Sequence, residues 1–307
     1  NAGLHSQYLD INNDLVLEPR LALNFQVRPN QKINLGYGLH HQMQPFPVFF
    51  NEEETSPGVF EPTNRDLAFV RSHHFVLGYD RRLGSDWRLK SELYYQMIRN
   101  AAVEIIPSSF SVLNAGADFV FPEAGSLVNE GIGTNYGIEL TLEKFFTKGY
   151  YGLLTTSIFD SKYEGSDGVE RNSAFNNNYV INVLGGKEFK IGQDKRNALT
   201  FDMKFTTAGG RYFTPVDLEA SRLAGEEVLN EELAFSERFD PYLRLDLKFG
   251  VRLNSKTKKF SQQFFLDLQN VTGNENIFTR RFNELTNEVN DVFQSGFFPD
   301  ILYRVQF

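Results

Sequence analysis

Charged side chains at alternate positions are the first candidates for chemistry in this sequence. Two sets stand out: Glu139 with Glu143, and the series Arg244, Asp246, Lys248 and Arg252. Residues two apart in an extended strand point to the same face, so each set would form one polar row. Such a row can contact a ligand or another part of the protein. It can equally be the solvated wall of a wide channel, and the sequence leaves both readings open.

Catalytic and metal-binding motifs are absent from the sequence. There is no cysteine, which removes thiolate catalysis and zinc-thiolate sites. No phosphate-binding loop, HExxH motif or nucleophile elbow occurs. The pairs His40-His41 and His73-His74 would point to opposite faces of a strand, so neither pair can chelate a metal as a unit. We therefore expect no enzyme activity, no metal and no cofactor.

The composition is unusual in its aromatic residues. Phe alone contributes 30 of the 307 residues, yet the mean hydropathy is −0.35. No window approaches the roughly 18 apolar residues that a membrane-spanning helix needs. A transmembrane β-barrel remains possible, because only every second residue of its strands faces lipid. The net charge of −8 argues against a nucleic-acid partner.

The dominant hydrophobic period is two, which predicts strands. Eleven segments show it to differing degrees: 15–28, 32–43, 72–83, 87–97, 136–146, 150–163, 178–191, 199–207, 239–253, 259–272 and 296–307. Many are much longer than the usual soluble strand of about 5–6 residues, and they suit a tilted membrane strand of about 9–11 residues. The sequence therefore predicts an all-β fold, an antiparallel transmembrane β-barrel with about eleven long strands.

The connections between these segments alternate in length. The short ones are 29–30, 84–86, 148–149, 192–196 and 254–258, and the long ones are 44–70, 101–133, 164–177, 209–238 and 273–294. Outer-membrane barrels show this pattern, with short periplasmic turns and long extracellular loops. On this count residues 1–14 lie outside and the carboxyl end is periplasmic.

An odd number of strands does not fit a complete single-chain bacterial barrel, which has an even number. We therefore expect residues 1–307 to be one domain, the carboxyl-terminal part of a larger barrel. A missed strand is the other explanation. No signal peptide begins at Asn1, so the start of the natural chain is also expected to lie outside this sequence.

The long loops hold the candidates for ligand contact, since loops on a rigid scaffold commonly carry recognition. The candidates are Phe46, Phe49, Phe50, Phe60, Phe110, Phe119, Arg211 and Tyr212. The aromatic rings suit sugars, hydrophobic ligands or a partner lipoprotein. They can equally pack the loops against one another or lie in the interfacial aromatic girdle.

The last predicted strand places Tyr303, Val305 and Phe307 on one face and ends on an aromatic residue. This ending resembles the signal that the barrel-assembly machinery reads on outer-membrane proteins. An ordinary edge strand that happens to end in Phe is the alternative.

Several motifs, taken in order, extend this resemblance over essentially the whole chain. They are LGYGLH at 35–40, YGIELTLEK at 136–144, FDSKY at 159–163, TAGGRYFTP at 207–215, LDLQNVT at 266–272, NIF at 276–278 and GFFPDILYRVQF at 296–307. Together they resemble TonB-dependent outer-membrane receptors of Bacteroidota type. The resemblance implies a barrel of about 22 strands, plugged by an amino-terminal domain, of which this chain is the second half.

The resemblance implies active import. A nutrient would bind at the extracellular loops and cross the plugged barrel with energy from the inner-membrane TonB system. The implied partners are outer-membrane lipid, the plug domain and first barrel strands of the same protein, the TonB system, the barrel-assembly machinery and, as a further candidate, a surface lipoprotein. The charged rows, including Glu139, Glu143, Arg244, Asp246, Lys248 and Arg252, would face the lumen and the plug. A non-transport barrel, such as an adhesin or a structural component of an envelope complex, remains the alternative function, and a barrel enzyme comes last.

Overall fold

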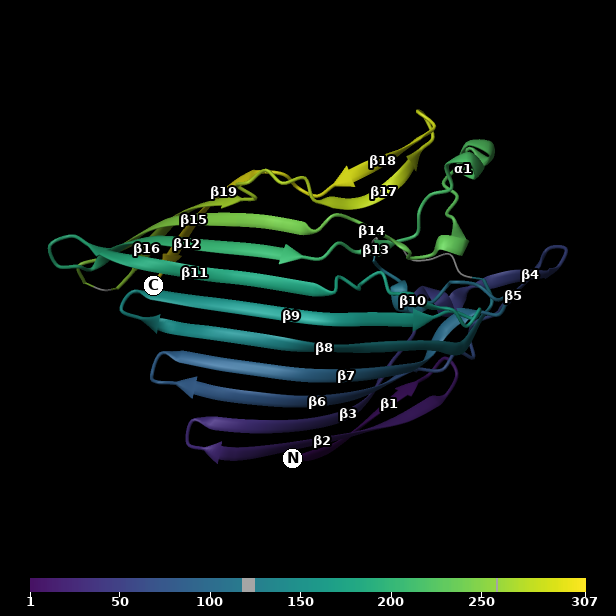
Figure 1. Cartoon of the computed structure of the whole chain (residues 1–307), viewed down its shortest axis with the longest axis horizontal. Helices are drawn as coiled ribbons and strands as arrows, with labels where there is room; N and C mark the ends of the chain where they lie inside the picture. Colours follow the sequence, from purple (N-terminus) through teal and green to yellow (C-terminus); the bar gives the residue numbers. More distant parts are fainter. Residues whose placement is uncertain (118–124, 258) are drawn as a thin grey trace.

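The computed structural model describes residues 1–117, 125–257 and 259–307. Within them, one antiparallel sheet of thirteen strands dominates the molecule (Figure 1). In sheet order the strands are β1 (Ala2–Leu9), β2 (Asp14–Arg28), β3 (Gln31–Gln42), β6 (Val70–Leu83), β7 (Trp87–Glu104), β8 (Leu127–Thr147), β9 (Tyr150–Glu164), β11 (Tyr179–Ile191), β12 (Asn197–Ala208), β15 (Tyr242–Asn254), β16 (Ser261–Gln269) and β19 (Phe298–Gln306), with β10 (Glu170–Asn172) beside β9. All eleven predicted strands are present, and the predicted fold class is confirmed.

One strand of the main sheet was missed. Residues 1–14 were expected to be an external segment, but β1 pairs with β2 from Ala2↔Leu21 to Leu9↔Asp14. The apolar alternation of this segment is interrupted by Ser6, and the strand has only eight residues, so its periodic signal is weak. The path from β1 to β19 thus contains twelve strands, one more than predicted. The odd count that had suggested a partial barrel was therefore wrong, and a missed strand was its explanation.

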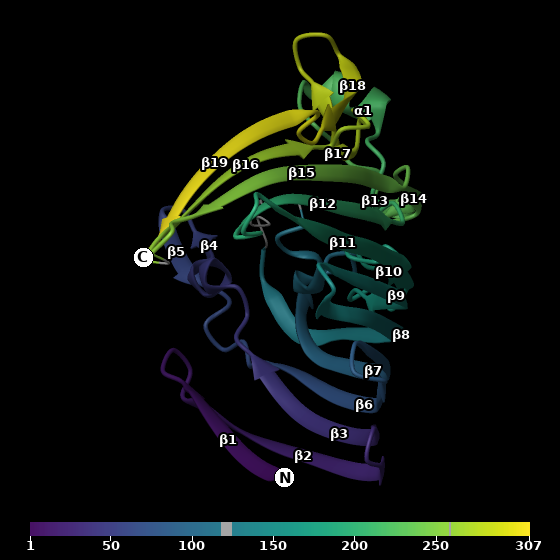
Figure 2. The same cartoon turned by 90° about the vertical axis from the view of Figure 1, so that its left-hand side faces the viewer.

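The sheet is strongly curved, with a concave and a convex side (Figure 2). Its two outermost strands, β1 and β19, do not pair with each other in the described part of the chain. Each therefore presents an open edge, with backbone groups that no neighbouring strand satisfies.

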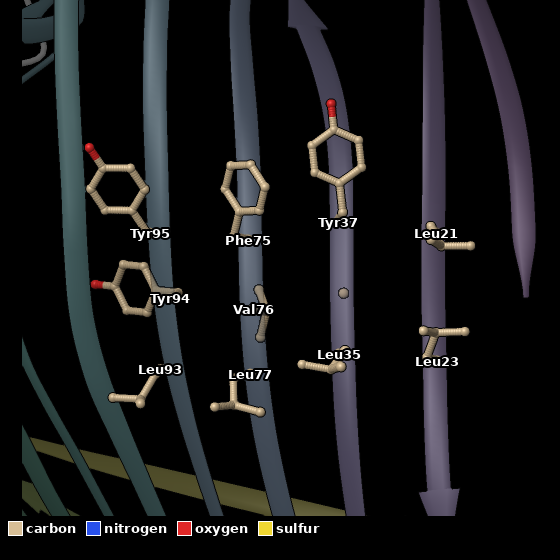
Figure 3. Close-up of a pocket in the computed structure, with 11 residues that line it drawn as sticks. Leu21, Leu23, Leu35, Tyr37, Phe75, Val76, Leu77, Leu93, Tyr94 and Tyr95 are labelled. Atoms are coloured by element: carbon tan, nitrogen blue, oxygen red, sulfur yellow. The ribbon is translucent and has the colours of Figure 1, made fainter.

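The convex face is apolar. The register aligns Leu35, Leu77, Leu93 and Ile138 across four neighbouring strands (β3, β6, β7 and β8). These side chains are 43% to 49% exposed, and Figure 3 shows the first three of them beside Tyr37, Phe75 and Tyr95. Soluble monomers rarely expose a continuous apolar surface of this extent. The convex face is therefore typical of a wall that contacts lipid.

The concave face is polar and rich in ion pairs. Arg252 contacts Glu188 at 2.7 Å, and Arg244 contacts Asp246 at 2.7 Å. The loops pack against Leu9 and Val16, and the register places these two residues on the same face of the sheet as the charged Glu18. The face that the loops cover is thus the polar face, and it is the concave one. All six residues predicted to face the lumen are placed on it by the strand register.

The two ends of the sheet differ. The short turns gather at one end, and the turn at Lys148 and Gly149 has positive φ at both residues (52° and 81°), as a tight two-residue hairpin requires (Figure 1). The long loops gather at the other end and contain their own elements: η1 (Phe46–Phe50), β4 (Glu52–Ser56), β5 (Val59–Pro62), η2 (Val112–Asn114), β13 (Tyr212–Phe213), α1 (Leu218–Ala224), η3 (Glu231–Leu233), β14 (Glu237–Arg238), β17 (Ile277–Asn283) and β18 (Glu288–Phe293). No helix in the described residues is long and apolar enough to cross a membrane.

Candidate ligand-binding site

A hydrophobic core holds several of the long loops together at their end of the sheet. Its buried members are Leu9, Val48, Phe49, Leu67, Phe69, Ala101, Ala102, Val112 and Leu127. Buried amides add hydrogen bonds between the segments: Asn64 Nδ2 donates to the carbonyl oxygen of Gly125 at 3.0 Å, and its Oδ1 accepts from the N–H of Leu127 at 2.8 Å. The loops at this end are thus a folded layer with a core of its own.

The predicted ligand contacts in this layer differ in how far they are exposed. Phe49 is 0% exposed, so we assign it to the loop core and correct its prediction as a ligand contact. Phe46 and Phe50 are more than half exposed, and their ring centroids lie 4.9 Å apart. Phe60 is exposed on β5. Phe119 lies outside the described residues.

A cavity of about 620 Å³, here called the loop cavity, lies among the long loops. It is lined by residues of four segments: Glu104, Ser108, Ser109, Phe110, Ser111, Asn114, Ala115, Gly116 and Ala117; Ala174; Arg211, Tyr212, Phe213, Thr214, Glu227, Leu229, Glu231, Phe235 and Phe239; and Thr279, Arg280 and Arg281. Three predicted residues, Phe110, Arg211 and Tyr212, therefore meet in one cavity. Phe46, Phe49, Phe50 and Phe60 do not line it.

Two glycines let the chain enter this cavity. A Cβ atom on Gly210 would lie 1.7 Å from the carbonyl oxygen of Phe239, and one on Gly209 would lie 1.9 Å from that of Asn177. Only glycine permits backbone approach this close. Arg211 and Tyr212 follow directly after these two closely packed glycines.

An aromatic shelf, formed by Phe213 and Phe239, lines one part of the loop cavity. The two rings are nearly parallel at 11°, with centroids 4.1 Å apart. The guanidinium of Arg280 lies 5.3 Å and 5.8 Å from their centroids, within cation–π range, and its Nε donates to Asp291 at 2.7 Å. Such a shelf can stack a planar group or the apolar face of a sugar.

The sequence prediction had placed Phe239 at the start of a strand, 239–253. In the structure β15 begins only at Tyr242, and Phe239 is buried at the cavity. Pro241 has no backbone N–H to donate to a neighbouring strand. This proline was the sign in the sequence that the strand starts later.

Acidic and basic residues line the loop cavity in equal number among the described residues. They are Glu104, Glu227 and Glu231, and Arg211, Arg280 and Arg281. Arg281 donates to Glu227 at 2.7 Å, and the hydroxyl of Ser109 donates to Glu231 at 2.5 Å. Arg211 donates to the carbonyl oxygens of Ala117 and Phe278. The cavity thus offers hydrogen-bonding groups and rings without a marked excess of either charge.

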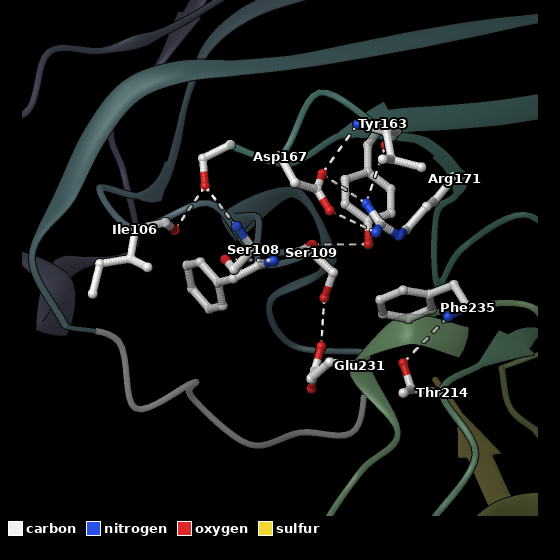
Figure 4. A network of polar contacts seen from close by, with 12 residues as sticks. Ile106, Ser108, Ser109, Tyr163, Asp167, Arg171, Thr214, Glu231 and Phe235 are labelled. Atoms are coloured by element: carbon white, nitrogen blue, oxygen red, sulfur yellow. Dashed lines mark hydrogen bonds and ion pairs between the residues drawn. The ribbon is translucent and has the colours of Figure 1, made fainter.

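A polar network joins three of the long loops beside the cavity (Figure 4). Tyr163 is 1% exposed, its hydroxyl donates to the carbonyl oxygen of Ser109 at 3.0 Å, and its ring meets Phe235 edge-on at 5.7 Å. The Ser109 hydroxyl continues the chain to Glu231. These contacts between the loops hold the walls of the cavity in place.

The loop after β9 is closed by an ion pair between Asp167 and Arg171, with nitrogen-oxygen distances of 2.6 Å and 2.9 Å. The Arg171 hydrogen bonds hold the pKa of Asp167 below its ordinary value, and the same contact raises the pKa of Arg171. The N–H of Asp167 also donates to the carbonyl oxygen of Ser108 at 3.3 Å, so this loop is tied to the neighbouring one.

We expect acid to release this loop. The pKa of Asp167 is lower in the folded protein than in the unfolded chain. The ion pair therefore stabilises the loop fully at pH values above the ordinary aspartate pKa of about 3.9. This stabilisation is lost as the pH falls through the lower pKa of the folded protein. A spin label at the exposed position of Val169 should therefore become more mobile in that acid range. In an Arg171→Gln variant the label should be mobile already at neutral pH, and an equally acid-sensitive label there would contradict this account.

The remaining predicted sites lie elsewhere. Tyr303 stacks on Phe264 on the convex face with centroids 4.6 Å apart, Val305 shares that face, and Phe307 is fully exposed. The rings of His40 and His74 lie 4.8 Å apart on the concave face. Among the described residues no group of three or more His, Asp or Glu side chains could hold a metal ion.

No protein-family model matches the sequence, and no curated protein matches it. The structure, however, resembles solved structures. The outer membrane transporter YddB from Escherichia coli matches with a TM-score of 0.65 and 12% identity, covering 99% of this chain and 43% of that one. The siderophore receptor PiuA from Acinetobacter baumannii matches with a TM-score of 0.59 and 15% identity, covering 96% and 36%. The ferric-catecholate import receptor Fiu from Escherichia coli K12 matches with a TM-score of 0.60 and 11% identity, covering 96% and 35%.

These matches define the class of fold. The sheet has the architecture of the barrel wall of these proteins, which are named as an outer membrane transporter, a siderophore receptor and an import receptor. The chain spans 35% to 43% of the length of the three structures described.

Proposed function

We propose that this chain is the carboxyl-terminal part of the barrel of a TonB-dependent outer-membrane receptor. The observation that carries the proposal is the two-faced, open sheet whose structured loops gather at one end around the loop cavity. The open edges at β1 and β19 would pair with the first barrel strands of the same protein. Its plug domain would lie against the polar concave face, where Glu139, Glu143 and the Arg244 to Arg252 row stand.

In this proposal the short turns face the periplasm and the long loops face the outside. A nutrient binds at the loop cavity, and the plug then rearranges with energy from the TonB system so that the nutrient crosses the lumen. Tyr303, Val305 and Phe307 on the last strand serve as the signal for the barrel-assembly machinery. The resemblance to receptors of Bacteroidota supports this assignment at the level of individual motifs.

The lining of the loop cavity favours an uncharged or mixed-charge organic ligand, such as a glycan or a peptide. The balanced lining charges do not especially attract a polyanion, and the Phe213 and Phe239 shelf suits a sugar face or a planar side chain. Two of the structural neighbours are named for siderophores or ferric catecholates, so ferric siderophores remain a class to test, as does cobalamin.

Uptake measurements on the full-length protein test this function. Cells that express it are given labelled glycans, peptides, siderophores or cobalamin, and uptake of one class should be lost when the inner-membrane energiser is deleted. Phe239→Ala should weaken binding of that ligand at least about tenfold, since stacking and packing at the shelf are lost. A matched control, Leu285→Ala at an exposed loop tip, should change neither. Uptake that persists without the energiser would contradict active transport.

One observation supports the alternative of an adhesin or a component of an envelope complex. The tips of α1 and of the β17–β18 hairpin project together from the loop layer (Figure 1), joined where Arg222 donates to the carbonyl oxygen of Asn287 at 3.0 Å. Leu223 and Leu285 on these tips are 90% and 94% exposed. Binding of a protein partner that fails on Leu223→Ser and Leu285→Ser, without any energised uptake, would favour this alternative.

A further inference from the structure

Positive charge collects at the short-turn end of the sheet, although the chain as a whole is acidic, with 39 acidic and 31 basic residues. Every one of the five short turns carries an exposed Lys or Arg within three residues of it. Six of these residues are here called the basic collar: Arg28, Arg81, Lys148, Lys195, Lys256 and Lys259. The five turns lie together at one end of the molecule (Figure 1).

The collar side chains form no ion pairs within the described part of the chain. None of the six side chains has an acidic partner within 4.0 Å there, while acidic groups of the same turns are paired with other bases. Asp86 lies 3.7 Å from Lys144, and Asp194 lies 3.2 Å from Arg196. The collar therefore presents cations that form no ion pair along the rim, although Asp86 acts on Lys148 at longer range.

A band of exposed aromatic side chains adjoins the collar on the convex face. The strand register places Trp87, Tyr150 and Phe189 in it, with exposures of 40% to 49%, and the exposed Phe146 and Phe260 lie next to the same turns. Aromatic side chains, Trp and Tyr above all, mark the boundary between hydrocarbon and headgroups in membrane proteins. The band thus places the collar, which lies just beyond it, at headgroup depth.

We propose that the basic collar binds the anionic headgroups of phospholipids in the membrane leaflet at the short-turn end. The charges follow the rim of a lipid-facing wall over five turns, an arrangement that suits many surrounding headgroups. Polybasic segments at a membrane surface attract anionic lipids, and the attraction acts within a Debye length. This inference rests only on the part of the proposed function that embeds the sheet in the outer membrane with its short turns inward, and it is independent of the nutrient.

Trp87 is the single tryptophan of the chain and lies in the aromatic band, so it reports on the lipid beside the collar. The full-length protein, with any other tryptophan replaced, is reconstituted in phosphatidylcholine vesicles. Quenching of Trp87 by brominated phosphatidylglycerol and by brominated phosphatidylcholine then gives the relative affinity of the two lipids at this place. We expect phosphatidylglycerol to be preferred about threefold at low salt, and the preference to fall toward one in 0.5 M NaCl.

The Arg81→Gln and Lys148→Gln double variant should abolish most of this preference. Lys90→Gln with Lys204→Gln removes the same charge from the concave face and should leave it unchanged. Equal quenching by the two lipids in the unsubstituted protein would overturn the inference, as would an equal loss in both double variants. If the collar variant does not assemble, the salt dependence of the unsubstituted protein decides alone. A failed uptake test would leave this result untouched.

Discussion

Replacing Leu35 by arginine is expected to destabilise the folded barrel by about 2–4 kcal/mol, the cost of a basic side chain near the bilayer midplane of a barrel wall. Leu35 lies in the apolar row with Leu77 and Leu93, and its side chain is 43% exposed in the isolated sheet. In lipid, that exposed surface would contact hydrocarbon, which cannot solvate a guanidinium. The measurement is urea unfolding of the full-length protein in lipid vesicles, followed by the gel shift between folded and unfolded forms.

The adjacent residue supplies the matched control. Asn34 points to the concave face. Gly78 lies between Asn34 and Glu92 and has both side chains as neighbours, so an arginine at position 34 can reach the Glu92 carboxylate. We expect Asn34→Arg to cost less than about 1 kcal/mol, the usual range for a substitution in a solvated lumen. Equal costs at positions 34 and 35 would show that the two faces do not meet different solvents.

Phe49→Ala is expected to cost about 3–5 kcal/mol of the stability of the loop layer, the usual range for a buried Phe. Phe49 is fully buried between Leu67, Phe69 and the alanines at the end of β7, and removing its ring leaves a cavity in a small core. The expected result is local: faster hydrogen exchange in residues 43–69 and 105–117, with the sheet unchanged.

Phe46 and Phe50 lie in the same short helix, η1, and provide internal controls. Both are more than half exposed, so Phe46→Ala should change exchange in these loops by less than about 1 kcal/mol. If Phe46→Ala loosened the loops as much as Phe49→Ala, the buried core described here would be wrong.

The strands could be predicted because each carries its own periodic signal. A segment such as 242–254 alternates strictly, and one face must be apolar for any membrane-facing sheet. β1 was not predicted, because its eight residues, interrupted by Ser6, hold too few apolar positions to establish a period. The open edges, in contrast, follow from pairings between strands and are visible only in the structure.

The candidate site was predictable only in part. Phe110, Arg211 and Tyr212 were recognised as loop residues, but the loop cavity depends on contacts between segments far apart in sequence, such as Ser109 with Glu231. No local pattern distinguishes the buried Phe49 from the exposed Phe46 three residues earlier. Phe239 was assigned to a strand because the alternation continues through it, and Pro241 was the one local sign against that assignment.

The orientation of the sheet in the outer membrane is the central claim, and single cysteines test it most directly. The chain contains no cysteine, so each substitution adds a unique thiol within it, in a full-length protein freed of any others. In intact cells a membrane-impermeant maleimide should label Leu223→Cys and Leu285→Cys on the long loops. It should label Ser85→Cys and Gln193→Cys on the short turns only after the outer membrane is permeabilised. Labelling of the short-turn thiols in intact cells, with the loop thiols protected, would contradict the account.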